Sequence, residues 1–458
     1  MSTEPAQKPN ILFIVSHDLG RHLNCYGQST VHSPNLDRLA AGGARLDNCF
    51  CSAPQCSPSR ASMMTGRYPH SNGVMGLTHA LSAWDLHNDE RTLPMVLRDA
   101  GYHTVLGSFQ HFTRKPPASV GFNEHLRFGG KGVKKARQAA QWLGEHADDD
   151  QPFFLHLAFF EPHRGIPDDE SRREPLRHHF VHGPDREHGV DVPPFLCDTE
   201  EARQEFAEYQ GDIRHLDDAM GVVLHALDET GLTDTTLVVF CADHGMPFPR
   251  AKCSVYDPGL EVATMVRWPG HIAPDTVVPQ LVGNVDYLPT LCDMLGLPVP
   301  DGVQGLSFAH LLRGEEGPTR DAVFGELTYH SYCSPMRCIR TAQYKLIVNF
   351  TSTPAFMDPS QSWRRATVPC VPEKPHMEHS KVVELYDLQN DPYEQQNLAE
   401  DAAHEDVRRQ LLGRLHLWLQ ETDDPILHGI PVPPMQRMAW HALGTGDVVQ
   451  TPEELADI

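Results

Sequence analysis

Long apolar runs are missing from this 458-residue sequence, and so is an excess of positive charge. The apolar run at residues 10–15 is too short for a signal-peptide core or a membrane span, and no basic stretch precedes it, so we expect no membrane segment. There are 38 lysines and arginines against 61 aspartates and glutamates, a formal net charge of −23. Nucleic-acid-binding proteins usually carry a basic surface, so this charge argues against that class. A local positive pocket for an anionic substrate remains compatible with an acidic exterior.

An even set of cysteines is also missing, because the chain has 11 of them. Together with the absent secretory pattern, this number argues against a disulfide framework and favours a reducing, cytoplasmic location. Hydrophobic residues make up 40% of the chain, the usual share for a globular protein with a large core. Histidine is abundant, with 28 residues, which suits metal or acid–base chemistry but also an ordinary surface.

Three apolar runs, at residues 10–15, 153–159 and 236–242, predict buried parallel strands. Each run is followed by Asp, His or Arg, which is typical of an active site at the carboxyl ends of an open α/β sheet. Helical patterns alternate with these runs, at residues 33–43, 59–66, 92–101, 131–145, 200–230 and 285–296. The predicted fold class is therefore α/β, with a large, mainly parallel, doubly wound sheet flanked by helices.

After about residue 314 the pattern changes to short strands, at 322–327, 336–341 and 344–350, followed by a helix at 405–421. We predict a catalytic α/β domain over residues 1–315 and a smaller C-terminal α+β subdomain with an antiparallel sheet over 316–458. The stretch rich in proline and histidine at 166–194 predicts a long loop over the edge of the sheet.

The most specific motif is Cys56-Ser-Pro-Ser-Arg60, which continues into a helix that ends near Gly66. As a local pattern it predicts a helix start with Ser57 or Ser59 as the N-cap. The order of these residues resembles the sulfatase family of the alkaline phosphatase superfamily. The resemblance continues over most of the chain, in the segments 9–14, 34–40, 65–70, 243–245 and 385–398.

This resemblance implies that Cys56 is oxidised to formylglycine by a formylglycine-generating enzyme. The hydrate of that residue offers one hydroxyl as a nucleophile toward sulfur, and the other expels sulfate as the aldehyde reforms. A helix N-terminus beside it would stabilise negative oxygens. Arg60 would orient the formylglycine and add positive charge.

The resemblance also implies a divalent metal ion, held by Asp18, Asp243 and His244, with the residue at Cys56 as a further ligand. Members of the family usually have Asp-Asp where this chain has His17-Asp18, so His17 either replaces a carboxylate ligand or points away. The family favours Ca²⁺, whereas imidazole ligands shift the preference toward Mn²⁺, Fe²⁺ or Zn²⁺.

Three further residues match positions that the family uses on the sulfate. His111 is expected to act as a base if one residue is inserted in the family's Gly-Lys-x-His segment, which reads Gly107-Ser-Phe-Gln-His111 here. The lysine of that segment is missing, and Arg114 or Lys115 are candidates to replace it. His163 is expected near the leaving group, because an imidazole pKa lies near working pH. Lys252 is expected to bind sulfate.

Within the family, the segments at 71–77, 245–249 and 334–337 are most similar to the heparan N-sulfatase branch, the sulfamidases. The expected activity is hydrolysis of a sulfate ester or N-sulfate on a small sulfated saccharide. Two alternatives stay open: a phosphodiesterase or phosphonate monoester hydrolase of the same superfamily, and a catalytically silent binding protein.

Overall fold

The computed structural model describes residues 8–79, 83–165, 180–352, 381–449 and 454. Part of the loop predicted at 166–194, residues 166–179, lies outside the described residues. Eight strands form a large sheet in the order β4-β3-β5-β1-β6-β7-β2-β8. Their bounds are β1 Asn10–Ser16, β2 Ala44–Phe50, β3 His103–Leu106, β4 Glu124–His125, β5 Phe153–Ala158, β6 Thr236–Ala242, β7 Thr264–Arg267 and β8 Thr276–Gly283.

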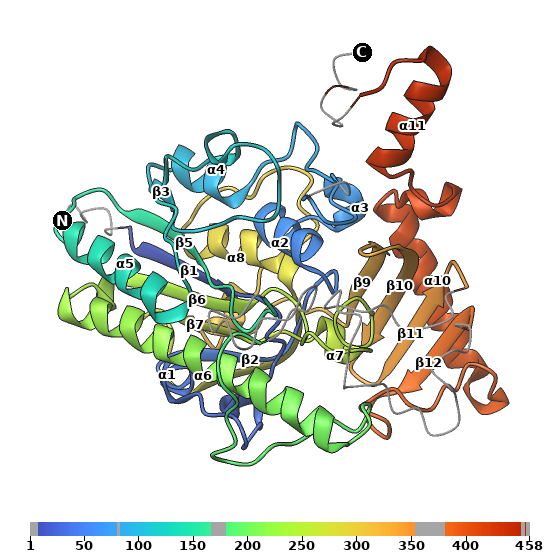
Figure 1. The fold of residues 1–458 in the computed structure, drawn as a ribbon, viewed down its shortest axis with the longest axis horizontal. Coiled ribbons are helices and arrows are strands. Elements are labelled where there is room, and N and C mark those ends of the chain that lie inside the picture. The colour runs from blue at the N-terminus through green and yellow to red at the C-terminus, as the bar shows by residue number, and fades with distance from the viewer. Residues whose placement is uncertain (1–7, 80–82, 166–179, 353–380, 450–453, 455–458) are drawn as a thin grey trace.

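This sheet is mainly parallel, and β7 alone among its strands runs antiparallel to its neighbours β6 and β2. Every residue of β5 and β6 is buried, as both faces of a central parallel strand should be. Helices α5 and α6 pack against each other, and Figure 1 shows α2, α4 and α8 grouped on the other side of the strands. The doubly wound α/β prediction is confirmed.

The helices of the described residues follow most of the predicted patterns closely. The α-helices are α1 Pro34–Ala41, α2 Cys56–Thr65, α3 Pro69–Asn72, α4 Leu93–Asp99, α5 Gly132–Glu145, α6 Glu200–Glu229, α7 Asp257–Leu260, α8 Tyr287–Met294, α9 Ala309–Leu312, α10 Glu405–Glu421 and α11 Pro434–Thr445. None of the described helices is long and apolar enough to cross a membrane.

A second sheet of four antiparallel strands, in the order β12-β11-β10-β9, follows in the sequence. Its strands are β9 Ala322–Tyr329, β10 Cys333–Thr341, β11 Tyr344–Asn349 and β12 Val383–Asp387. Helix α10 packs on this sheet through Leu411, Leu415 and Trp418, which form a small core separate from that of the large sheet. The predicted smaller α+β part is present, and the division at residue 315 stays a prediction.

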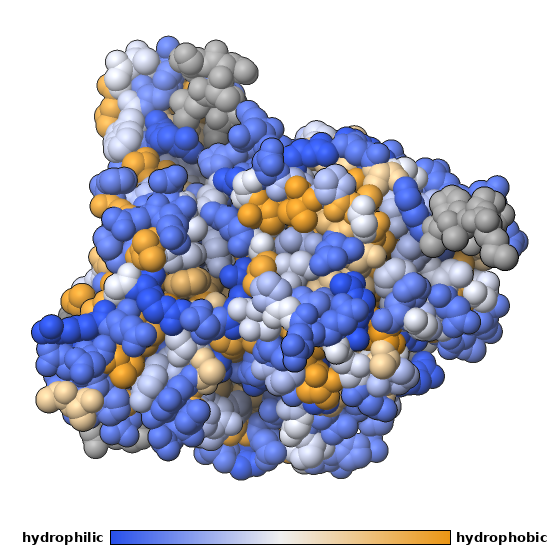
Figure 2. Space-filling view, turned by 180° about the vertical axis from the view of Figure 1, so that it is seen from behind, coloured by the Kyte–Doolittle hydropathy of each residue, from blue (hydrophilic) through white to orange (hydrophobic). Residues whose placement is uncertain are grey.

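The surface seen in Figure 2 is largely hydrophilic, with smaller hydrophobic patches. Helix α11 projects from the body of the molecule in Figure 1, and its Trp440 and Leu443 are exposed. None of the ten cysteines in the described part of the chain forms a disulfide.

Candidate functional site

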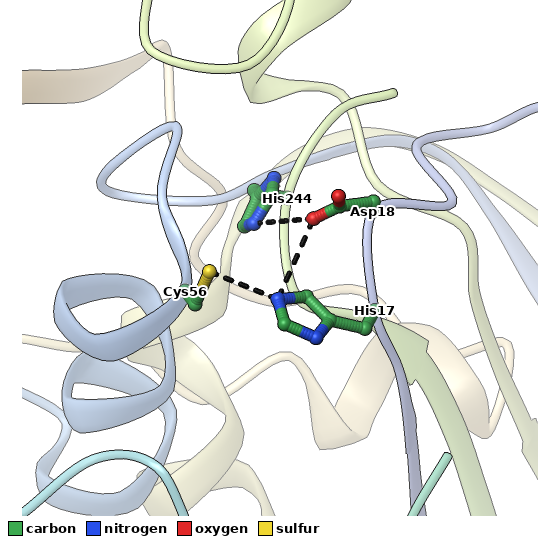
Figure 3. A group of neighbouring side chains, drawn as sticks. All are labelled: His17, Asp18, Cys56 and His244. Atoms are coloured by element: carbon green, nitrogen blue, oxygen red, sulfur yellow. Dashed lines mark hydrogen bonds and ion pairs between the residues drawn. The ribbon is translucent and has the colours of Figure 1, made fainter. Parts of the chain in front are cut away.

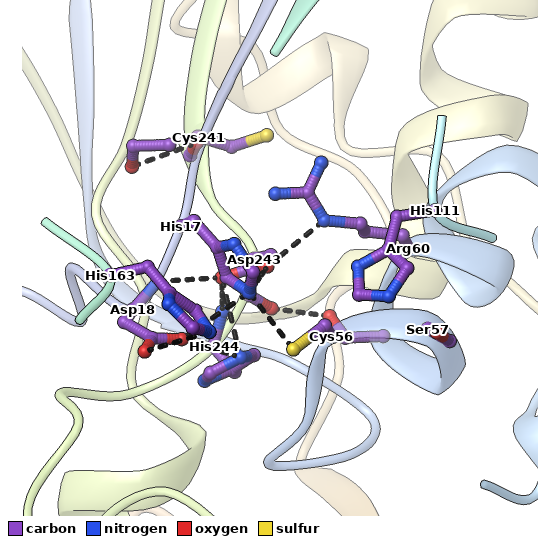
Figure 4. Close-up of polar contacts among 12 residues, drawn as sticks. His17, Asp18, Cys56, Ser57, Arg60, His111, His163, Cys241, Asp243 and His244 are labelled. Carbon is purple, nitrogen blue, oxygen red and sulfur yellow. Dashed lines mark hydrogen bonds and ion pairs between the residues drawn. The ribbon is translucent and has the colours of Figure 1, made fainter. Parts of the chain in front are cut away.

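The carboxyl ends of three adjacent strands, β5, β1 and β6, meet at one edge of the large sheet. His17 and Asp18 follow β1, His163 follows β5, and Asp243 and His244 follow β6. Parallel strands place these residues side by side, although they lie far apart in the sequence. The structure therefore brings together the polar residues that the three apolar runs deliver (Figure 4).

Cys56 is the first residue of α2, and all ten residues of that helix are buried. The predicted N-cap is wrong, because Gln55 occupies that position. Neither serine is available for capping, since Ser57 Oγ accepts a hydrogen bond from the Thr78 backbone N–H and Ser59 Oγ donates to the Asp243 carbonyl. The two serines thus fix the start of the helix through contacts with distant segments.

Four donor side chains, those of His17, Asp18, Cys56 and His244, gather around one point (Figure 3). One ligand atom from each lies within 4.8 Å of the others, and all four residues are buried. Nε2 of His17 lies 2.9 Å from Cys56 Sγ and 3.5 Å from Asp18 Oδ1. The described chain thus holds a group of nitrogen, oxygen and sulfur donors that could bind a metal ion.

His244 has the geometry of a metal-binding imidazole. Its Nδ1 donates a hydrogen bond to the Gly245 carbonyl, 3.0 Å away. Nε2 lies 3.1 Å from Asp18 Oδ1 but forms no well-aligned hydrogen bond within the described residues. Burial disfavours the imidazolium, but the Asp243 and Asp18 carboxylates outweigh it and raise the pKa of His244 to about 10. Once Nε2 loses its proton, the neutral ring therefore keeps Nδ1–H and presents its lone pair to the cluster.

Asp243 organises the site through its own hydrogen bonds and is not among the four clustered donors. Its Oδ1 accepts from the backbone N–H groups of Asp18, at 3.0 Å, and His244, at 2.9 Å. Its Oδ2 accepts from Arg60 Nε at 2.9 Å. These bonds connect the ends of β1 and β6 to helix α2.

Lys252 forms an ion pair with Asp18, and its Nζ donates hydrogen bonds to the two carboxylate oxygens at 2.8 and 3.0 Å. Burial alone would raise the pKa of Asp18, but the Lys252 ammonium and the neighbouring imidazoles hold it well below its usual value. Both side chains are almost completely inaccessible to solvent. The chain therefore keeps an ionised carboxylate in a buried position.

The histidines around the cluster are neutral at neutral pH. Burial lowers the pKa of His163 to about 4, although Asp18 partly opposes this effect. Burial and the cation at Arg60 hold the pKa of His111 well below its usual value. His163 Nδ1 donates to the Arg164 carbonyl at 2.5 Å, and its Nε2 lies 3.9 Å from Asp18 Oδ2. His111 Nε2 lies 3.1 Å from Nδ1 of His79, a partner that the sequence did not indicate.

A pocket of about 1240 Å³ opens onto this cluster. Its lining includes His17, Cys56, His111, His163 and Lys252, together with Arg114 and Lys115. Lys115 Nζ donates to the backbone carbonyl of His87, 2.9 Å away.

Lys135 is another pocket residue that was not predicted from the sequence. It comes from α5, is buried, and its Nζ donates to the Ala158 carbonyl at 2.7 Å. Its Nζ lies 5.1 Å from the ring of Phe109, and Arg60 lies 5.2 Å from the same ring. Burial lowers the pKa of Lys135 to about 8. The sequence did contain a signal for this position, because Lys135 falls on the same apolar face of the helix as Ala139 and Trp142.

Comparisons with known proteins agree with the fold described above. The Sulfatase family model matches residues 9–297, and the model described as N-sulphoglucosamine sulphohydrolase, C-terminal, matches residues 247–358. Human N-sulphoglucosamine sulphohydrolase is 28% identical over 462 residues, covering 92% of this chain and 91% of its own.

Two solved structures illustrate the range of this fold. BT4656, determined with its substrate D-glucosamine-2-N,6-O-disulfate, has a TM-score of 0.66 at 20% identity and covers 91% of this chain and 98% of its own. A phosphonate monoester hydrolase from Silicibacter pomeroyi has a TM-score of 0.68 at 19% identity, covering 91% and 96%. At these identities the two structures show a shared fold alone.

Proposed function

Because the chain belongs to the sulfatase family, we propose that it releases sulfate from a small N-sulfated saccharide. The match of residues 247–358 to the C-terminal model of N-sulphoglucosamine sulphohydrolase supports this substrate class. The similarity to the human enzyme of that name over most of both chains supports it further. The disulfated glucosamine bound by BT4656 is a ligand of the same chemical kind in a protein of the same fold.

The observation that carries the proposal is the position of Cys56. It begins a buried helix and lies 2.9 Å from His17 at the edge where β1 and β6 end. We propose that a formylglycine-generating enzyme converts it to formylglycine, whose hydrate supplies the nucleophilic hydroxyl. The N-terminus of α2, the positive end of its helix dipole, then lies beside the sulfate that this residue receives.

We propose that Asp18, His244, His17 and the side chain at position 56 hold a divalent cation. Asp243 joins them, because its carboxylate oxygens lie 3.5 Å from Nε2 of His17 and of His244. The lone-pair position on His244 Nε2 and the ionised Asp18 carboxylate fit such an ion. When bound, the cation lowers the pKa of the nucleophile and withdraws charge from sulfate oxygens. Two imidazoles beside a carboxylate favour Mn²⁺, Fe²⁺ or Zn²⁺, whereas the family resemblance favours Ca²⁺.

His163 and His111 are proposed to move the protons. His163 fixes one proton on Nδ1 through the Arg164 carbonyl, so Nε2 is free to take up a second one. A bound sulfate brings negative charge into the pocket, which raises the pKa of His163 and allows it to protonate the departing amine. His111, whose Nε2 contacts His79, is suited to accept a proton from the nucleophilic hydroxyl.

Three cations favour an anionic substrate. Arg60 is anchored to Asp243 through Nε, while its two terminal nitrogens are buried without a hydrogen-bond partner among the described residues. Lys252 and Lys135 add positive charge at the pocket wall. Buried positive groups in and behind the pocket wall attract sulfate much more strongly than they would in water.

A comparison of substrates tests the proposal. We expect sulfate release from glucosamine N-sulfate and from short N-sulfated oligosaccharides to exceed release from the matching O-sulfates. Turnover of a phosphonate monoester by the same preparation should be lower still. Preferential phosphonate turnover would support the alternative activity, and no turnover of any substrate by fully converted, metal-loaded protein would support a silent binding protein.

We also propose a cytoplasmic location, which suits small saccharides as substrates better than intact polymers.

A further inference from the structure

A second group of ligand-type side chains lies outside the pocket's cation cluster. It consists of Glu161 after β5, His182, and His215 on α6, and one ligand atom from each lies within 4.8 Å of the others. From this group we infer a second metal site, for Zn²⁺ or a similar transition-metal ion. The evidence for this site does not rest on the reaction proposed above.

The environment of the Glu161 carboxylate indicates that a cation binds there. Glu161 is only 1% exposed, and neither carboxylate oxygen has a hydrogen-bond partner within the described part of the chain. A buried carboxylate that lacks hydrogen bonds of good geometry is costly, and a cation is the usual compensation. Burial would raise the pKa of Glu161, but the facing His182 imidazole and the Lys135 ammonium help to keep it below its usual value. The group is therefore a charged ligand.

The spacing fits a tetrahedral ion. Glu161 Oε1 lies 3.6 Å from His182 Nε2. Two ligand atoms on a tetrahedral zinc, at bond lengths near 2.1 Å, are separated by about 3.4 Å. The rings of His182 and His215 stack with centroids 3.6 Å apart, so the second imidazole is already beside the first. Two imidazoles and one carboxylate suit Zn²⁺ better than Ca²⁺.

The surrounding structure holds these side chains in place. Asp212, one turn before His215 on α6, accepts hydrogen bonds from the backbone N–H groups of Val181 and His182. A Cβ at Gly211 would lie 1.8 Å from the Gly183 carbonyl oxygen, so only glycine allows this segment to lie so close to α6. A Cβ at Gly132 would likewise overlap the His215 ring.

A metal ion here would connect the loop after β5 to helix α6. That loop also carries His163, two residues after Glu161. The Glu161 carbonyl accepts a hydrogen bond from the backbone N–H of His17, 3.3 Å away. We therefore assign this site a positioning role for the loop, in addition to binding the ion.

Zinc binding by the 458-residue chain tests this inference. The apo protein, prepared with a chelator, is titrated with Zn²⁺, and bound zinc per chain is measured by calorimetry and by mass spectrometry of the element. The measurement is made in an Asp18→Asn background, which weakens the pocket's cation site. His215→Ala should abolish one class of sites, or weaken it more than about 100-fold, since even an altered outer partner of a ligand commonly costs 10–100-fold.

The matched control is His225→Ala, which removes an exposed histidine paired with Glu229 on the same helix. It should bind as much zinc as its parent. Glu161→Gln, which keeps the shape of the side chain, should reproduce the loss if His215→Ala impairs folding. Zn²⁺ should also raise the melting temperature of the parent but not of the Glu161→Gln variant. Equal zinc binding by the parent, His215→Ala and Glu161→Gln would overturn the assignment. The group would then be a stacked pair of imidazoles beside a carboxylate, with no role in binding a metal ion.

Discussion

Nε2 of His17 lies 2.9 Å from Sγ of Cys56, and both side chains are buried. Burial and the neighbouring His163 hold the pKa of His17 well below its usual value. A neutral imidazole can bind a metal ion but cannot neutralise its charge. The identity of residue 17 therefore affects which cation the proposed metal site prefers.

Replacing His17 by Asp should change the preferred metal. A carboxylate oxygen in place of a ring nitrogen favours hard cations. We expect the ratio of Ca²⁺ to Mn²⁺ affinity to rise at least about tenfold in His17→Asp, the size of effect that changes around metal ligands commonly have. Calorimetric titration of apo protein with each ion measures the ratio. An unchanged ratio would mean that His17 points away from the ion.

Metal binding should release a proton from His244. Without metal its pKa is raised to about 10, because the nearby Asp243 and Asp18 carboxylates outweigh the effect of burial. The apo protein therefore carries this proton at neutral pH, and the cation must displace it. Titration at pH 7 in buffers of different ionisation enthalpy should show about one proton released per ion. The release should fade as the pH rises through 10, and His244→Asn should abolish it.

The affinity for sulfated substrates should depend on the protonation of Lys135. Its pKa is lowered to about 8 by burial, so its positive charge is present below that pH and is lost above it. We expect KM to rise as the pH passes 8, with a smaller change in kcat. In Lys135→Arg this rise should disappear, because arginine stays charged. Lys135→Met should raise KM about tenfold or more at pH 7, the value of a charge-assisted hydrogen bond. An identical pH profile in Lys135→Arg would exclude this role.

Much of the site could be predicted because the carboxyl ends of buried strands can be recognised in the sequence. The apolar runs before Asp18 and Asp243 mark two strands that become neighbours, and parallel strands bring their carboxyl ends together. Lys135 could not be predicted in the same way. Its helix reaches the pocket through its packing with α6, a contact between segments that are distant in the sequence. The capping prediction at Ser57 and Ser59 was wrong for a similar reason, since tertiary partners compete for both hydroxyls.

A buried ionic cluster should dominate the stability of the smaller sheet. Arg337 is fully buried and pairs with Asp424, Nε to Oδ2, at 2.5 Å, and with Glu326 at 3.3 Å. Asp424→Ala leaves this guanidinium underpaired, and we expect a loss of about 3–5 kcal/mol in the free energy of unfolding. Denaturant unfolding measures the loss. The exposed Arg313–Glu315 pair is the control, and Arg313→Ala should cost less than about 1 kcal/mol.

The central claim is that Cys56, once oxidised to formylglycine, is the nucleophile of a sulfatase. Mass spectrometry of the peptide containing residue 56 gives the converted fraction, and sulfate release from glucosamine N-sulfate is measured on the same preparations. With the formylglycine-generating enzyme co-expressed at different levels, activity should rise in proportion to the converted fraction, and Cys56→Ala should be inactive. Full activity in a preparation whose Cys56 remains a thiol would contradict the account.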